Sequence, residues 1–111
     1  MLKLWDVKTG KEISNLEGHS NTIRSICFLN DGKMVASGSR DKIIKIWNIE
    51  TGKVIRNLEE HTYCVSSICL SSDGKKLVSG SYDEYIIVWN VETWKVIRKI
   101  KAGDSVASVC F

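Results

Sequence analysis

The 111-residue sequence lacks the long apolar stretches that accompany secretion or membrane insertion. Its N-terminal segment does not combine a charged start, an apolar centre and small residues in the manner of a signal peptide. No apolar run approaches the roughly 18 residues that cross a bilayer. We therefore expect an intracellular protein, cytoplasmic or nuclear, without a membrane partner.

Runs of one charge sign are also missing. Lys plus Arg number 16 and Asp plus Glu 13, which gives a formal net charge of +3 with both signs scattered along the chain. A protein that binds nucleic acid mainly through its phosphates usually carries a larger or more concentrated excess of cationic residues. Nucleic acid is therefore only the alternative partner. It would be bound by four scattered arginines: Arg24, Arg40, Arg56 and Arg98.

Signatures of metal and nucleotide binding are absent as well. The four cysteines contain no CxxC pair, and the two histidines, His19 and His61, are far apart in the sequence. Cys27, Cys69 and Cys110 stand inside apolar runs, where a thiol behaves as a small buried hydrophobe. Neither GxGxxG nor GxxxxGK[ST] occurs. The sequence predicts no metal and no cofactor.

What the chain does contain is an internal repeat. Trp5, Trp47 and Trp89 recur every 42 residues (47 − 5 and 89 − 47). Laying 20–61 over 62–103 without a gap gives 19 identical pairs in 42. A fixed period of this size is typical of solenoids, propellers and other arrays. We therefore interpret residues 1–111 as one repeat array.

Each period alternates short apolar segments with turn residues. In the first full period these segments are 23–28, 34–37, 43–47 and 54–58, and Asp31-Gly32 separates the first two as a typical hairpin turn. No segment keeps the apolar spacing of an amphipathic helix. One repeat is therefore predicted to be four short β-strands.

A four-stranded antiparallel sheet with two apolar faces buries both by stacking between similar sheets, as in a β-propeller. The predicted fold class is all-β, a partial β-propeller with two full blades plus partial blades at both ends. The predicted boundaries are 2–18 for the end of one blade, 20–58 and 62–100 for full blades, and 106–111 for the first strand of a further blade. Two blades cannot close a ring, so we expect a fragment of a longer propeller or, alternatively, a set of blades that self-associates.

Several motifs recur in register with these strands. Gly18-His19 precedes the first strand, Ser37-Gly38-Ser39 and Asp41 follow the second, and Trp5-Asp6 closes a third strand. With these motifs the chain resembles the WD-repeat β-propeller family over essentially its whole length. The resemblance implies a propeller scaffold without a cofactor.

The resemblance also implies one hydrogen-bonded network of His, Ser, Asp and Trp in each blade. These residue types could form a Ser-His-Asp catalytic triad. Repetition in every blade, with an indole N–H completing the set, favours a structural role instead and predicts a protein that is not an enzyme. The network residues are His19, Ser37, Asp41 and Trp47 in one blade and His61, Ser79, Asp83 and Trp89 in the next.

Members of the family often contact partners at the start of a blade's first strand and just before the corner aspartate. Transferred by register, these positions predict a non-catalytic scaffold that binds a protein or peptide on this loop face. The remaining alternatives are a nucleic-acid-associated subunit and a purely architectural set of blades. The candidate contact residues are Thr22, Arg24, Arg40, Cys64, Ser66, Tyr82, Ser105 and Ala107.

Overall fold

The computed structural model describes residues 2–5, 12–16, 22–29 and 32–109, which form β-strands without an α-helix. None of these segments is a helix long and apolar enough to cross a lipid bilayer. The predicted all-β class is confirmed. The strands are β1 (Leu2–Trp5), β2 (Glu12–Leu16), β3 (Ile23–Leu29), β4 (Met34–Ser39), β5 (Ile44–Asn48), β6 (Lys53–Leu58), β7 (Val65–Leu70), β8 (Lys76–Ser81), β9 (Tyr85–Asn90) and β10 (Val96–Lys101).

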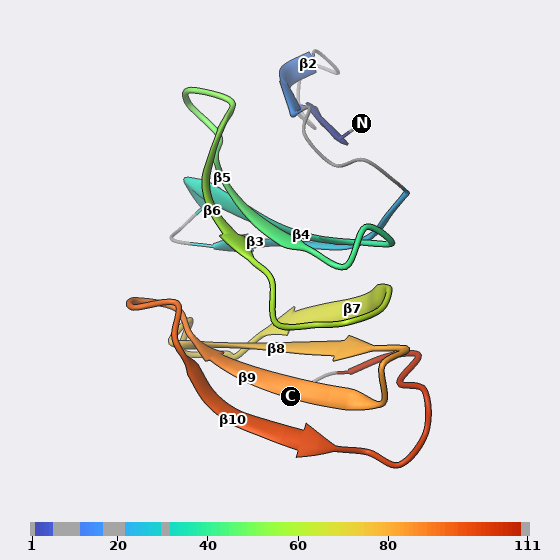
Figure 1. Ribbon diagram of the computed structural model, residues 1–111. Helices are drawn as coiled ribbons and strands as arrows, with labels where there is room; N and C mark the ends of the chain where they lie inside the picture. Colours follow the sequence, from blue (N-terminus) through green and yellow to red (C-terminus); the bar gives the residue numbers. More distant parts are fainter. Residues whose placement is uncertain (1, 6–11, 17–21, 30–31, 110–111) are drawn as a thin grey trace.

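Two four-stranded antiparallel sheets stack face to face (Figure 1). The first blade has the order β3-β4-β5-β6 and the second the order β10-β9-β8-β7. Within each blade, every strand therefore pairs with the strand that follows it along the chain. β1 and β2 form a separate two-stranded ladder. No strand is assigned to 106–109, where the sequence predicted an opening strand, because strand assignment requires a hydrogen-bonded neighbour.

The hairpin turns of the two blades depend on glycine at the same place in the repeat. Gly32 has φ +83° and Gly74 has φ +73°, and a Cβ at either position would meet nothing within 4 Å. The requirement is therefore conformational, since glycine accepts positive φ without a steric penalty. This agrees with the interpretation of the Asp-Gly pairs as turns.

The main apolar core lies between the two blades. It contains Ala36, Ile44 and Ile46 of the first blade, and Leu77, Ile87 and Trp89 of the second. At Gly38 a Cβ would lie 2.7 Å from Cγ1 of Val65, so the missing side chain is what lets β7 approach β4.

The segment that follows β10 packs on the second blade as β7 packs on the first. A Cβ on Gly80 would lie 2.6 Å from Cγ1 of Val106, just as one on Gly38 would meet Val65. The two valines are 41 residues apart (106 − 65), one fewer than the repeat period. Residues 105–109 therefore continue the array with a one-residue shift.

The outer faces of the pair of blades are more exposed than the shared interface. Leu58, in β6, is 6 % exposed, whereas Ile100, at the same place in β10, is 42 % exposed. In the first strands, Ile68 is 6 % exposed and its counterpart Ile26 is 41 % exposed. Stacking of one blade on the next thus decides whether these positions are buried.

Candidate functional site

The second blade brings together the four residues predicted as its network. His61 lies in the loop before β7, Ser79 in β8, Asp83 in the turn after β8, and Trp89 in β9. His61 Nδ1 is 2.8 Å from Asp83 Oδ2, and His61 Nε2 is 2.7 Å from Ser79 Oγ. The Trp89 indole N–H donates to Ser79 Oγ at 2.9 Å. The four side chains therefore form one continuous chain of hydrogen bonds.

The direction of each hydrogen bond follows from donor and acceptor capacity. A carboxylate only accepts, so His61 Nδ1–H donates to Asp83, and the Nε2 of a neutral imidazole then accepts the Ser79 hydroxyl proton. Burial lowers the pKa of His61, although the hydrogen bond and charge of Asp83 oppose this effect, and the neutral form is favoured. Within the described residues, every buried side-chain nitrogen or oxygen has a partner.

This order of groups matches a serine nucleophile with its base, but the nucleophile is inaccessible. Ser79 is fully buried and His61 is 5 % exposed. The Ser79 oxygen also accepts the Trp89 indole N–H. A substrate carbonyl therefore cannot approach the hydroxyl without unfolding the corner, and the geometry supports a structural role.

Asp83 also fixes the turn between β8 and β9. Its Oδ2 accepts the Thr62 N–H at 3.0 Å and its Oδ1 the Tyr85 N–H at 2.9 Å. Burial alone would raise the pKa of Asp83, but the hydrogen bonds from Thr62, His61 and Tyr85 hold it below its usual range. Ser81, the other serine of Ser-Gly-Ser, accepts the Asp83 N–H at 3.0 Å and so belongs to the turn.

The first blade repeats the described part of this arrangement. Trp47 Nε1 donates to Ser37 Oγ at 2.8 Å, and Asp41 Oδ1 accepts the Ile43 N–H at 3.1 Å. Ser39 donates to the Thr22 carbonyl at 3.0 Å. His19 lies outside the described residues. Ser37 and Ser79 thus take the same place beside the two indoles.

The corners of both blades lie at the same end of the molecule, the right-hand end in Figure 1. Here Arg24 of β3 meets Tyr82, which follows β8. Arg24 Nη2 donates to the Tyr82 hydroxyl at 3.3 Å, and the guanidinium carbon lies 5.9 Å from the ring centroid. Residues from neighbouring blades therefore form one exposed contact.

Other predicted contact residues surround this pair. Thr22, Arg40, Ser105 and Ala107 are exposed. The Arg40 N–H donates to the Thr22 carbonyl at 2.9 Å, and the Ser105 hydroxyl donates to the Tyr82 carbonyl at 3.4 Å. These bonds tie Arg40 to Thr22 and Ser105 to Tyr82.

Two predicted contact residues do not reach the surface. Cys64, just before β7, is 3 % exposed, and Ser66, within β7, is 7 % exposed. The Ser66 hydroxyl faces the carbonyl oxygens of Gly80 and Val106. Their side chains cannot contact a partner that docks on this end, which corrects the expectation for these two positions.

One residue on this end was missed from the sequence. Tyr63 precedes β7 and is 60 % exposed, and its carbonyl accepts the Ser81 hydroxyl at 3.2 Å. Asn21 occupies its place in the preceding repeat. The available signal was an aromatic side chain in an otherwise polar loop. We use the name loop face for the exposed or half-buried residues Thr22, Arg24, Arg40, Tyr63, Tyr82, Ser105 and Ala107.

The four arginines considered for nucleic-acid binding do not share a surface. Arg24 and Arg40 belong to the loop face, whereas Arg56 and Arg98 lie on β6 and β10, the outermost strands of the two blades. The structure therefore does not gather them into one cationic surface.

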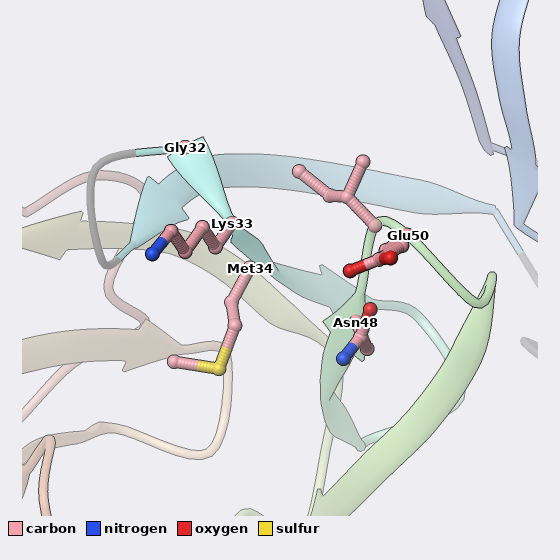
Figure 2. Close-up of a pocket in the computed structure, with 6 residues that line it drawn as sticks. Gly32, Lys33, Met34, Asn48 and Glu50 are labelled. Atoms are coloured by element: carbon pink, nitrogen blue, oxygen red, sulfur yellow. The ribbon is translucent and has the colours of Figure 1, made fainter.

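A shallow hollow of about 470 Å³ lies at the other end of the strands, beside the hairpin turn of the first blade. Figure 2 shows Lys33 and Met34 on one side of it and Asn48 and Glu50 on the other. Its lining carries both charge signs. In the described segments, no group of three or more His, Cys, Asp or Glu side chains could hold a metal ion.

Stacked four-stranded blades with a corner network define a repeat protein of the β-propeller class. The model of the family described as "WD domain, G-beta repeat" matches residues 10–48 and 52–90. The chain belongs to this WD-repeat family, which confirms the resemblance inferred from the motifs. WD repeats generally mediate protein–protein interaction within complexes, and the family is typically non-catalytic.

Individual relatives share about one repeat with this chain. "WD repeat and SOCS box-containing protein 1" of Danio rerio is 46 % identical over 44 residues, which are 39 % of this chain and 10 % of that protein. "Guanine nucleotide-binding protein subunit beta" of Schizosaccharomyces pombe is 40 % identical over 42 residues, 38 % of this chain and 14 % of that protein. The alignments thus span only a small part of these relatives' length.

A solved structure resembles nearly the whole chain. "Structure of U3-55K" matches with a TM-score of 0.87 and 27 % identity over 97 % of this chain and 35 % of that chain. The similarity supports the propeller architecture.

Proposed function

We propose that this chain is a non-catalytic scaffold that binds a protein or peptide partner on its loop face. The observation that carries the proposal is the contact between Arg24 and Tyr82, which joins neighbouring blades in an exposed position. Arg and Tyr are over-represented among the residues that dominate binding energy at protein interfaces. Tyr63, which is 60 % exposed, adds a second aromatic side chain beside the half-buried Tyr82.

Preorganisation supports this role. The guanidinium of Arg24 has five N–H donors, and the bond to Tyr82 uses one, which leaves others for a partner's carboxylate or carbonyl groups. The Tyr82 backbone is held by its N–H bond to the Cys64 carbonyl at 3.1 Å. A partner therefore binds side chains that are already ordered in the folded protein, so that less conformational entropy is lost on binding.

An intracellular location belongs to the same proposal. Among the described residues, Cys27, Cys64 and Cys69 are free thiols, as expected in the reducing cytoplasm or nucleus. The buried Ser79 hydroxyl supports the non-catalytic part, because the triad-like set has no access to a substrate.

The test is quantitative affinity capture with the full-length protein carrying Arg24→Ala and Tyr82→Ala. We expect the double variant to lose about 30-fold or more in capture of direct partners, since two interface residues that each contribute about 1 kcal/mol or more together remove about 2 kcal/mol or more. Its circular dichroism spectrum should stay unchanged because both side chains lie at the surface.

Arg56→Ala is the matched control, since it removes an exposed arginine from β6, away from the loop face. Capture by this variant should equal that of the wild type. If the double variant also captures every partner at the wild-type level, the loop face is not the binding site, and the purely architectural alternative is favoured.

A further inference from the structure

The outermost strand of the second blade, β10, is an exposed edge strand. Among the described strands, β10 pairs with β9 alone in the sheet order β10-β9-β8-β7, and all six of its residues are exposed. An edge strand of this kind presents a row of backbone N–H and C=O groups with which another extended chain can pair. Ile97 and Ile100, 50 % and 42 % exposed, lie on the same strand and offer apolar contacts.

The charged residues of this edge are all positive. Residues 95–102 contain Lys95, Arg98, Lys99 and Lys101 and no acidic residue, a net charge of +4. The corresponding stretch of the first blade, 53–60, has two cations and two glutamates, a net charge of zero (+2 − 2). Two edges with the same fold thus differ by four charges, so the cationic character is not imposed by the blade architecture.

The cations are distributed over both faces of the strand. Arg98 pairs with Val88 and Lys99 with Ile87 in the register of β10 on β9, and neighbouring residues in a strand point to opposite faces. The Lys99 ammonium lies 4.6 Å from the centroid of the Tyr85 ring, which orients that side chain. A segment lying along β10 would therefore have positive charge on either side.

We propose that the outer edge of β10 binds an extended acidic peptide segment, which adds to the second blade as a fifth strand. Backbone pairing along β10 supplies affinity, and Glu or Asp side chains at alternate positions of the segment all point to one face, where Lys99 and Lys101 also lie. The structure favours a peptide over nucleic acid because β10 itself carries no aromatic side chain on which bases could stack. This surface is separate from the loop face and does not depend on it.

The experiment uses the full-length protein and a fluorescein-labelled nonapeptide of alternating Glu and Val, with binding followed by fluorescence anisotropy at 50 and 150 mM salt. Two further probes share its length: the same sequence with every backbone amide N-methylated, which removes the donors from both edges of the peptide, and a Lys-Val peptide. We expect binding of the Glu-Val peptide alone, weaker at the higher salt. A single-stranded oligouridine serves as the nucleic-acid probe.

The matched variant is Lys99→Asn with Lys101→Glu, which places in β10 the residues found at the same register in the first blade, Asn57 and Glu59. The charge of the edge falls from +4 to +1, and we expect about tenfold weaker binding, since exposed charge pairs each contribute modestly. The reciprocal variant, Glu59→Lys with Glu60→Ala, should create a second site at β6 and raise the stoichiometry from one peptide to two.

The proposal fails if the Glu-Val peptide does not bind, or if the N-methylated peptide binds equally well, because strand addition requires the backbone donors. Tighter binding of oligouridine than of the peptide would assign the edge to nucleic acid instead. An unchanged affinity of the Lys99→Asn, Lys101→Glu variant would place the peptide elsewhere.

Discussion

The protonation state of His61 is decided by its immediate neighbours. Its ring lies between a carboxylate and a hydroxyl that is itself bonded to the Trp89 indole. A protonated ring would place two N–H donors in the chain, and the Ser79 hydroxyl would then have to accept from both His61 and Trp89. The corner is therefore built for the neutral imidazole, in agreement with the lowered pKa of His61.

This environment predicts acid sensitivity. The pKa of His61 is below its value of 6.5 in the unfolded chain, so the unfolded state binds more protons once the pH falls below that value. The contribution of His61 to stability is thus complete above about pH 6.5 and is lost as the pH falls toward its lowered folded-state pKa. Asp83, whose pKa is also lowered, adds a further loss near its own unfolded value of 3.8.

Urea unfolding measured between pH 7.5 and pH 5 should show the free energy of unfolding falling with pH. His61→Gln should be less stable at pH 7.5 and should show a shallower decline, because the titrating group is gone. An identical slope in the variant would mean that another group causes the acid sensitivity.

At the scale of the strand, the close packing of one blade on the next depends on two glycines, which have no side chain. Gly38 in β4 admits Val65 of β7, and Gly80 in β8 admits Val106. Gly38 and Gly80 have ordinary backbone conformations, and glycine is needed there because a side chain would not fit. At the hairpin glycines, by contrast, it is the positive φ that requires glycine. Cores packed this closely have no room for an additional methyl group.

Gly38→Ala should therefore destabilise the protein by about 1–3 kcal/mol through overpacking. In Gly38→Ala with Val65→Ala, the new methyl group partly fills the space left by valine, so the double variant should lose less than the sum of the two single variants. Thermal or urea unfolding of the four proteins measures this cycle. Strict additivity would show that the two positions do not share space.

The strands and the blade order were predictable because apolar segments and Asp-Gly turns are local signals. The choice of Ser79 over Ser81 as the partner of Trp89 came from the family resemblance and not from the residue pattern, since both serines are fully buried in β8. The burial of Ser66 could not be predicted from the sequence either. The ladder shifts register between Val65 and Ser67, so the strand loses its strict alternation, and the small Ser66 side chain turns toward carbonyl groups.

For the molecule as a whole, burial follows the stacking of blades more than the identity of the residues. Leu58 and Ile100 have the same place in their blades and similar size, yet only Leu58 packs in the core between the blades. Leu58→Ala should cost about 2–4 kcal/mol in the 111-residue chain, since it leaves a cavity in a packed interface. Ile100→Ala removes a side chain that is 42 % exposed and should cost less than about half as much.

Denaturant unfolding of both variants at two protein concentrations makes this comparison informative about assembly. A small, concentration-independent cost for Ile100→Ala is expected for an open outer face. A cost equal to that of Leu58→Ala, growing with protein concentration, would instead show that another copy of the chain covers β10 and its neighbours, because mass action adds the binding energy of the assembly to the measured stability.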